Sequence, residues 1–202
     1  MIKNIIYDLG GVLIDWDPRY MYRTIFESEE AMEYFLANIC TSDWNEQQDG
    51  GRLISEANAC LIATYPQYKA EIEAFYNRWT EMLGGPVAQM VAGLQTIAMH
   101  KKQRLVALTN WSAETWPEAT SRYDFLNIFE GILVSGHEQL KKPDPAIYQL
   151  LCDRYDLVAE ESLFIDDNHR NIVAAQQLGI QTIHHISSDS TLEQLQALGL
   201  LG

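Results

Sequence analysis

The spacing of apolar residues divides the chain into three regions. Ile2, Ile5, Ile6 and Tyr7 form a short, mostly β-branched run, which is typical of a strand buried in a parallel sheet. From about residue 18 to residue 86, apolar residues recur at helical spacing and no strand-like run is present. Beyond residue 86, strand-like runs alternate with helical patterns. The chain is therefore expected to be an α/β protein with a helical segment inserted after its first strand.

The inserted segment is expected to contain about four helices. Its apolar positions fall into four groups, which span residues 21–25, 32–39, 54–62 and 72–83. We divide the chain accordingly into a core of residues 1–15 and 86–202 and a helical cap of residues 16–85.

The alternating region is expected to supply four further strands and five helices. The strands are expected at residues 105–110, 131–135, 162–166 and 180–184. The helices are expected at residues 87–100, from about 117, at 145–152, at 172–178 and from about 190. Asp144 resembles an N-cap before Pro145, and Ser190 with Glu193 resembles a capping box. The predicted fold class is α/β: a Rossmann-like, doubly wound parallel sheet with an inserted four-helix cap.

Charge and composition restrict the partners and the compartment. The formal charge of −14 disfavours nucleic acid and anionic membranes, because both require a basic face. The three cysteines are widely spaced and fit a reducing compartment. No apolar run approaches membrane-spanning length, and the N-terminus enters a strand directly. We therefore expect a soluble, cytoplasmic protein; the sequence leaves its oligomeric state open.

Polar residues stand where three of the predicted strands end. They are Asp8, Thr109-Asn110 and Asp166-Asp167, and Lys142 lies in a loop before a predicted helix. The carboxyl ends of parallel strands meet at one edge of a sheet, where open α/β sheets bind their ligands. Carboxylates, a hydroxyl and an ammonium gathered there suit Mg²⁺ beside an anionic substrate. The pattern indicates phosphoryl transfer in particular, since that chemistry depends on positioning and charge neutralisation.

These residues, in this order, resemble the haloacid dehalogenase superfamily of hydrolases. The matching motifs are Asp8-x-Gly-Gly-Val-Leu, Leu-Thr109-Asn, Lys142-Pro-Asp-Pro and Asp166-Asp167-x-x-x-Asn171. The resemblance covers essentially the whole chain, because the helical insert is similar to the cap of subfamily I. The Asp-Leu-Gly start is similar to that of sugar-1-phosphate phosphatase-like members.

The resemblance implies a role for each residue that binds phosphate. Asp8 would be the nucleophile and would form an aspartyl-phosphate. Thr109 and the backbone N–H of Asn110 would bind the phosphoryl oxygens. Lys142 would neutralise charge on Asp8 and the phosphate, whereas Lys141 is expected to face solvent.

The resemblance also implies a magnesium site. Asp8 and Asp167 would ligate Mg²⁺ directly, and Asp166 would do so directly or through water. Gly10 would contribute its backbone carbonyl. Asn171 is expected to order the acidic loop rather than contact the substrate.

Gly10 departs from the pattern of the family's phosphatases. Most of them carry an aspartate at this position, which protonates the leaving group and then activates water. A general acid typically contributes about 10²–10⁴-fold in rate. A phosphatase without it would favour leaving groups of low basicity, such as those of anomeric sugar phosphates. Alternatively, water or a cap carboxylate would replace it, the candidates being Asp15, Asp17, Asp43, Glu46 and Asp49.

Two other functions remain open at this stage. A 2-haloacid dehalogenase also lacks the second aspartate, and its nucleophile attacks carbon. The Asp166-Asp167 pair speaks against this function, because a halocarboxylate needs no Mg²⁺ site. A phosphate-binding regulatory module with weak catalysis is the other alternative. The retained Asp8, Lys142 and Asp167 argue against complete loss of activity.

The polar stretch of residues 41–50 surrounds a single tryptophan, Trp44. One interpretation is a loop over the active site in which Trp44 stacks on a sugar or ring face. The other is a helix capped by Ser42 or Asp43, with Trp44 in the core of the cap. His184-His185 is expected to lie far from the motifs.

Overall fold

The computed structural model describes residues 1–202, and its centre is a five-stranded parallel sheet. The strands are arranged in the order β5-β4-β1-β6-β7. Their bounds are β1 Asn4–Tyr7, β4 Arg104–Thr109, β5 Gly131–Val134, β6 Ser162–Asp166 and β7 Gln181–His184. All five strands were expected at these places, which confirms the α/β fold class. Each expected run agrees with its strand to within two residues at either end.

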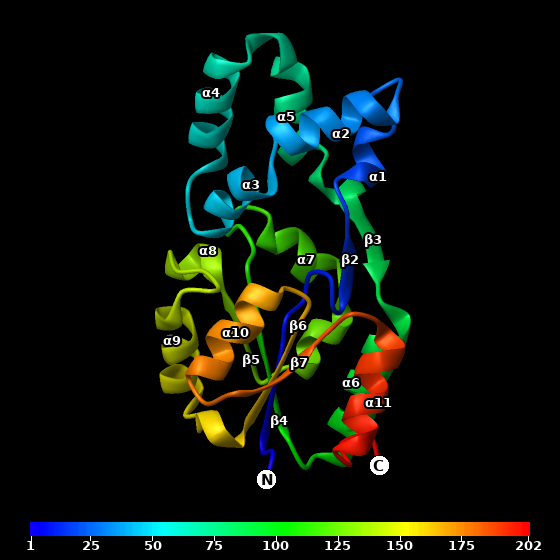
Figure 1. The fold of residues 1–202 in the computed structure, drawn as a ribbon, viewed down its shortest axis with the longest axis vertical. Helices are drawn as coiled ribbons and strands as arrows, with labels where there is room; N and C mark the ends of the chain where they lie inside the picture. Colours follow the sequence, from blue (N-terminus) through cyan, green and yellow to red (C-terminus); the bar gives the residue numbers. More distant parts are fainter.

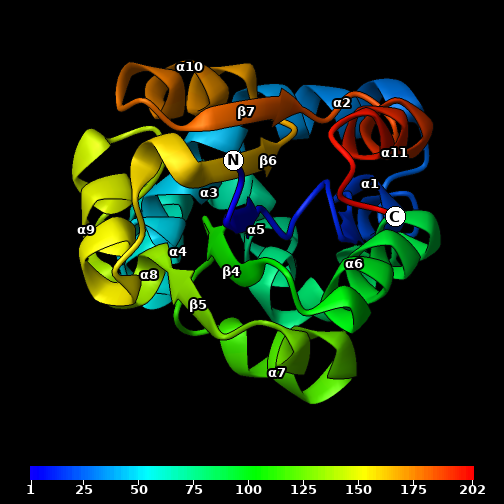
Figure 2. The same ribbon diagram turned by 90° about the horizontal axis from the view of Figure 1, so that it is seen from below.

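Helices cover both faces of the sheet, as Figures 1 and 2 show. Because side chains alternate along a strand, Ile5 and Tyr7 join one apolar cluster and Ile6 joins the other. The first cluster includes residues of α6 (Ala88–His100) and α11 (Ser188–Ala197), and the second those of α9 (Pro145–Tyr155) and α10 (His169–Gln177). The fold is therefore doubly wound. None of its helices combines the length and apolar character needed to cross a bilayer.

Small polar side chains cap three of the core helices, α9, α10 and α11. Asp144 caps α9 as expected, accepting the N–H of Ala146 at 2.9 Å. The helix α10 starts three residues before its expected position because Asn168 caps it. The remaining core helices are α7 (Trp116–Arg122) and α8 (Ser135–Glu138), with 3-10 turns at Asp124–Ile128 and Ala159–Glu161.

The predicted capping box of the last helix is wrong. Ser187, three residues earlier, is the N-cap and accepts the N–H of Ser190 at 3.3 Å. Ser190 and Glu193 therefore lie inside α11. Either serine could begin this helix by local sequence alone, and Ser187 is the one with extended backbone.

Five helices gather at the end of the molecule opposite the chain termini (Figure 1). They are α1 Arg19–Tyr22, α2 Glu29–Asn38, α3 Ser42–Asp49, α4 Ile54–Thr64 and α5 Lys69–Asn77, with 3-10 turns at Pro66–Tyr68 and Trp79–Met82. Rings of Tyr22, Phe35 and Phe75 pack among them, with the Tyr22–Phe35 centroids 5.0 Å apart. The first predicted helix is only the single turn α1. The polar stretch 41–50 instead forms a helix, capped by Thr41.

Two linkers that were not expected to be strands join these helices to the sheet. β2 (Ile14–Trp16) and β3 (Leu83–Pro86) pair in antiparallel fashion. The Gly-Gly-Pro sequence of β3 has poor strand propensity, so this pairing depends on tertiary context. Gly84 allows Asp15 to pack against the backbone, since a Cβ would lie 2.0 Å from Asp15 Oδ2 and would displace that side chain. We propose that this two-stranded element separates the core, residues 1–15 and 86–202, from the cap, residues 16–85.

Candidate active site

The polar residues at the strand ends meet at one edge of the sheet. Asp8, Thr109 and Asp166 stand at the carboxyl ends of the three neighbouring strands β1, β4 and β6. The chain leaves β1 toward β4 and β5 and later returns on the other side with β6 and β7. Such a switch point is where open α/β sheets form a ligand crevice. The loop before α9 brings Lys142 to the same place.

Lys142 is buried between two carboxylates. Its Nζ lies 2.8 Å from Asp8 Oδ2 and 2.7 Å from Asp166 Oδ2, and it donates to the carbonyl of Leu108 at 2.9 Å. Burial alone would lower the pKa of Lys142, but Asp166 and Asp8 more than offset it, and the pKa is raised. The side chain is therefore an ammonium with all three of its hydrogens directed at oxygen.

Asn110 holds the lysine loop in place. Its Nδ2 donates to the carbonyl of Lys142 at 2.9 Å, and its Oδ1 accepts the N–H of Lys142 at 2.9 Å. The resemblance implied only a backbone role for Asn110 in phosphate binding, and this side-chain role was not predicted. An amide can pair with both polar groups of one backbone residue, which explains why the site uses asparagine.

Asp166 is a fully occupied acceptor. It is completely buried and accepts from Lys142, from the N–H of Asn168 at 2.8 Å, and from Nδ2 of Asn171 at 3.0 and 3.1 Å. Asn171 thus orders the acidic loop, as expected from the sequence. Both oxygens of Asp166 already accept hydrogen bonds, which favours contact with a metal ion through a bridging water over direct coordination.

Close approach at one of two adjacent glycines shapes the neighbouring acidic loop. Gly11 has φ +72°, and a Cβ on it would lie 2.3 Å from Asp167 Oδ2. Gly11 therefore allows Asp167 to sit against the backbone after β1. The space around a Cβ built on Gly10 is open, with nothing within 4 Å.

The acidic groups at this edge fit a divalent cation. Carboxylate oxygens of Asp8, Asp166 and Asp167 all lie within 4.8 Å of one another. Burial raises the pKa of Asp8 well above its usual value, and Asp166 and Asp167 raise it further, while Lys142 opposes them. Burial and Asp166 likewise raise the pKa of Asp167. One ammonium leaves negative charge in excess, and hard oxygen ligands are those that Mg²⁺ prefers.

Thr109 offers an unused hydroxyl at the end of β4. The residue is fully buried and its Oγ1 has no hydrogen-bond partner. Buried polar atoms are nearly always paired, so this hydroxyl is suited to a ligand oxygen. The geometry is compatible with the phosphate-binding role that the resemblance implies.

A cavity of about 370 Å³ lies between the sheet edge and the helical segment. Asp8, Gly10, Asn110, Lys142 and Asp167 line it from the core. Helix α3 lines it from the other side, and the residues that it contributes are Ser42, Asn45, Glu46 and Asp49. The polar stretch 41–50 therefore does cover the site, but as a helix rather than as a loop.

The predicted stacking role of Trp44 is wrong. Trp44 does not line the cavity; its ring packs edge-on against Phe75, with centroids 5.2 Å apart, and against Tyr76 at 5.6 Å. The alternative, a tryptophan in the core of the cap, is correct. The tryptophans that line the cavity are Trp16, Trp79 and Trp111.

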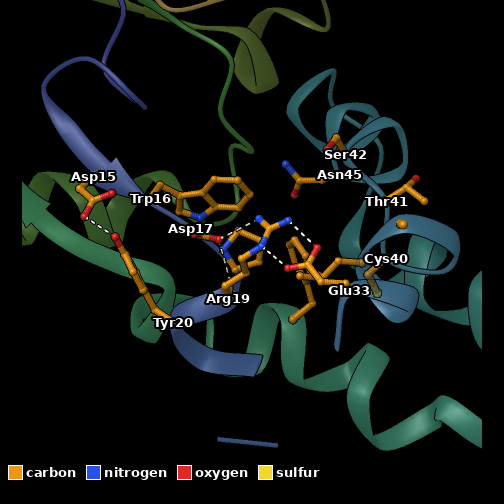
Figure 3. Close-up of a pocket in the computed structure, with 14 residues that line it drawn as sticks. Asp15, Trp16, Asp17, Arg19, Tyr20, Glu33, Cys40, Thr41, Ser42 and Asn45 are labelled. Atoms are coloured by element: carbon orange, nitrogen blue, oxygen red, sulfur yellow. Dashed lines mark hydrogen bonds and ion pairs between the residues drawn. The ribbon is translucent and has the colours of Figure 1, made fainter. Parts of the chain in front are cut away.

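A second cavity, of about 530 Å³, adjoins the first. The two share Trp16, Ser42 and Asn45. Figure 3 shows Trp16 on one side and the α3 residues on the other. Arg19 fills part of the space between them and pairs with Glu33 at 2.5 Å, where α2 begins its second turn.

Ion pairs connect α3 to the core. Glu46 pairs with Lys141 at 2.8 Å and with Arg170 at 2.7 Å. The expectation that Lys141 faces solvent was therefore wrong, because α3 comes down over its loop. Ser135 adds a hydrogen bond from its Oγ to the carbonyl of Asp49 at 2.5 Å.

His184 also lies closer to the site than expected. β7 pairs with β6, so the end of β7 lies beside the acidic loop. His184 Nε2 is 2.9 Å from the carbonyl oxygen of Asp167. It contacts the backbone rather than the carboxylates.

Comparison with known proteins agrees with this geometry. A sesquiterpene phosphatase of Aspergillus oryzae is 29% identical over 201 residues, covering 97% of this chain and 96% of its own. A haloacid dehalogenase family enzyme of Bacteroides thetaiotaomicron, solved with magnesium and inorganic phosphate, is 25% identical with a TM-score of 0.66. That match covers 91% of this chain and 93% of the other.

An L-2-haloacid dehalogenase of Xanthobacter autotrophicus shares the fold. It is 17% identical, with a TM-score of 0.63, over 100% of this chain and 85% of its own. The model of the haloacid dehalogenase-like hydrolase family matches residues 5–185, from β1 to just beyond β7. The chain, with its acidic strand ends and buried lysine, belongs to the haloacid dehalogenase-like hydrolases.

Proposed function

We propose that this hydrolase is a Mg²⁺-dependent phosphatase that cleaves a small phosphorylated metabolite through an aspartyl-phosphate on Asp8. The observation that carries the proposal is the contact of 2.8 Å between Asp8 Oδ2 and the buried ammonium of Lys142 beside the cavity. This contact favours an ionised, nucleophilic carboxylate and also supplies positive charge to an incoming phosphate. Similarity to a phosphatase and to a family enzyme that binds magnesium and phosphate supports the proposal.

Each residue of the edge has a role in the proposed reaction. An Asp8 carboxylate oxygen attacks phosphorus while the bond to the leaving group breaks. Thr109 donates its unpaired hydroxyl to a phosphoryl oxygen, and the backbone N–H of Asn110 donates to another. Lys142 stabilises the negative charge that Asp8 and the phosphoryl group bring together.

The acidic set would hold the metal ion. Asp8, Asp167 and the carbonyl of Gly10 are the proposed direct ligands, and Asp166 is proposed to act through water. When bound, Mg²⁺ neutralises charge on the phosphoryl oxygens. Asp167 has room for this role because Gly11 has no side chain.

The adjoining cavity indicates the chemistry of the substrate's organic part. Asp15, Asp17 and Glu33 line it with acceptor oxygens, while Arg19, its one lining cation, is already paired with Asp17 and Glu33. A second anionic group would find no free positive charge there. Hydroxyl groups would find acceptors, and Trp16 presents an aromatic face of the kind that packs on a sugar. We therefore propose a sugar monophosphate as the substrate class.

The proposal is tested with purified protein, Mg²⁺ and a substrate panel. The panel contains anomeric sugar phosphates, sugar phosphates on primary hydroxyls, phosphoglycolate, p-nitrophenyl phosphate and 2-chloropropionate. Asp8→Asn removes the nucleophile, and Asp124→Asn, at an exposed aspartate outside both cavities, is the matched control.

We expect phosphate release that needs both Mg²⁺ and Asp8, with sugar monophosphates preferred over phosphoglycolate. Chloride release without metal would establish a dehalogenase instead. Phosphate binding in the presence of Mg²⁺, without turnover of any substrate, would establish the binding module.

A further inference from the structure

The proposed phosphatase lacks a proton donor at Gly10, but the cavity contains another carboxyl. Asp49, the last residue of α3, lines the same cavity as Asp8, Lys142 and Asp167. It is half-buried and takes part in no ion pair. We propose that Asp49 protonates the leaving group and then activates the water, an inference that rests on the proposed phosphatase function.

The other cap aspartates considered from the sequence do not reach this place. Asp15 and Asp17 line only the adjoining cavity, where they bond to Tyr20 and Arg19. Asp43 is exposed and lines neither cavity.

Glu46 lines the same cavity as Asp8, but both of its carboxylate oxygens are already paired with cations. Its two oxygens are held by Lys141 and Arg170 at 2.8 and 2.7 Å. Burial alone would raise the pKa of Glu46, but these two cations outweigh it and lower the pKa. Glu46 is therefore a carboxylate at neutral pH and has no proton to donate.

The backbone of Asp49 is fixed to the phosphate-binding edge. Ser135, at the end of β5, donates its hydroxyl to the carbonyl of Asp49 and accepts the N–H of Trp111 at 2.9 Å. Trp111 directly follows the Thr109-Asn110 pair. One serine hydroxyl thus sets the position of the cap residue relative to the loop that would bind phosphate.

The side chain of Asp49 is oriented by an amide. Asn45 Nδ2 donates to Asp49 Oδ2 at 3.2 Å, and Asn45 Oδ1 accepts the Tyr76 hydroxyl at 2.9 Å. Gln48 in turn donates to that hydroxyl at 3.1 Å, so the amide of Asn45 has one orientation. No side chain bonds to Asp49 Oδ1; besides Asn45, the backbone N–H of Ser112 is the donor to this carboxyl group. The two oxygens of a carboxyl group offer about four lone-pair sites, so acceptor and donor capacity remains for a leaving group or a water.

The surroundings of Asp49 suit proton exchange near neutral pH. Burial raises the pKa of Asp49 to about 7, and the nearby carboxylate of Glu46 contributes to the rise. Lys141, the backbone N–H of Ser112 and Lys142 oppose it. A pKa near the working pH is the optimum for a group that must both give and take a proton.

The chemical steps balance with Asp49 as the only proton carrier. In the first step Asp8 bonds to phosphorus, the bond from phosphorus to the leaving oxygen breaks, and the proton of Asp49 moves to that oxygen. In the second step water attacks phosphorus, its proton returns to Asp49, and the Asp8 carboxylate leaves. The products are the free alcohol and inorganic phosphate, and both aspartates regain their initial state.

The test compares leaving groups in Asp49→Asn, with Asp43→Asn on the same helix as the matched control. The probes are a sugar phosphate on a primary hydroxyl and p-nitrophenyl phosphate, whose leaving group needs no proton. We expect kcat/KM of D49N to fall about 10²–10⁴-fold for the sugar phosphate and less than about tenfold for the aryl phosphate. D43N should match the wild type on both.

The pH profile and the reaction course give two further readouts. For wild-type protein, kcat/KM on the sugar phosphate should fall as pH rises through about 7, because Asp49 loses its proton there. This limb should disappear in D49N. With p-nitrophenyl phosphate, D49N should show a burst of product equal to the enzyme present, because hydrolysis of the intermediate has also lost its base.

A double variant tests whether the lost group is an acid. The open space at Gly10 admits a side chain, so Gly10→Asp in the D49N background should restore turnover of the sugar phosphate. Equal losses on both substrates, or an unchanged sugar phosphate rate in D49N, would overturn the role of Asp49. Turnover independent of Asp8 or Mg²⁺ in the wild type would instead overturn the phosphatase proposal itself. Should D49N fail to fold, Asp49→Ser serves for the same comparison.

Discussion

At the scale of single residues, the site depends on one buried cation between buried anions. Lys142 contacts Asp8 and Asp166, and its side chain is 1% exposed. A charge that is removed from water is tolerated when its partners and hydrogen bonds are complete. Removing the ammonium would leave two buried carboxylates without a counter-ion.

We expect Lys142→Met to lower the free energy of unfolding by about 3–5 kcal/mol at pH 8. Burial already raises the folded-state pKa of Asp8, and without the opposing charge of Lys142 this pKa rises further above its unfolded value. Groups with raised folded pKa values favour the folded state at low pH and lose this contribution as pH rises. The destabilisation should therefore be smaller at pH 5, as urea unfolding in chelator-treated buffer would measure.

The matched control for this change is Lys141→Met. Its partly exposed ion pair with Glu46 should contribute about 0–1 kcal/mol. A Lys142→Met protein as stable as wild type at pH 8 would show that the buried charges are not coupled as described.

We expect alanine substitutions at two adjacent glycines to have opposite effects on stability and Mg²⁺ binding. Gly11→Ala forces a Cβ into Asp167 Oδ2 at φ +72°, which should cost about 1–3 kcal/mol of stability. It should also weaken Mg²⁺ binding by about 10–100-fold, because Asp167 is displaced. Gly10→Ala, with open space around its Cβ, should keep both properties near wild type. Mg²⁺ titrations followed by thermal unfolding compare the two, and equal behaviour would contradict the assigned steric roles.

The sequence predicted the positions of individual site residues where a motif defines the end of a strand or the start of a helix. It brought Asp8, Lys142 and Asp167 together before any geometry was known, because Asp8 and Asp167 stand at the ends of predicted strands and Lys142 lies in the loop before a predicted helix. It could not predict which way Trp44 points, because the sequence of this helix has no apolar stripe that shows which face is buried. Nor could it distinguish Asp49 from four other acidic residues of the cap.

At the scale of elements, α3 connects the cap to the catalytic edge. Only Trp44 and Gln48 of this helix are buried, so its sequence carries no amphipathic signal. The β2–β3 pair was missed for a related reason, since β2 is only three residues long and the Gly-Gly-Pro sequence of β3 has poor strand propensity. Elements that exist through contacts between segments distant in sequence are those that local patterns fail to predict.

Glu46 should hold α3 over the site without adding much to overall stability. Each of its ion pairs is partly exposed and worth about 0–1 kcal/mol. We expect Glu46→Gln to change the free energy of unfolding only slightly. We expect it to raise KM for the phosphate substrate several-fold, because the cap is held less firmly over the site. Steady-state kinetics against Glu56→Gln, an exposed glutamate on α4, would measure this. An unchanged KM would show that the ion pairs of Glu46 are not needed to hold α3 over the site.

At the scale of the whole molecule, the site must bind an anion although the protein as a whole is negatively charged. A protein of formal charge −14 must attract an anionic phosphate, and the site meets this with a buried ammonium and a metal-binding edge. The parallel sheet makes this possible by gathering residues 8, 109 and 166 from strands far apart in sequence. Alternation of strands and helices sufficed to predict that architecture.

The most direct test of the account is to find the phosphoryl group on the protein. Wild-type protein with Mg²⁺ and substrate is quenched in acid within one turnover, and its peptides are mapped by mass spectrometry. Asp49→Asn, in which the second step should be slow, serves as the variant that accumulates the intermediate. We expect one added phosphoryl group on Asp8 that is absent from Asp8→Asn. Substrate hydrolysis without this modification, or with the phosphoryl group on another residue, would contradict the central claim that Asp8 is the nucleophile.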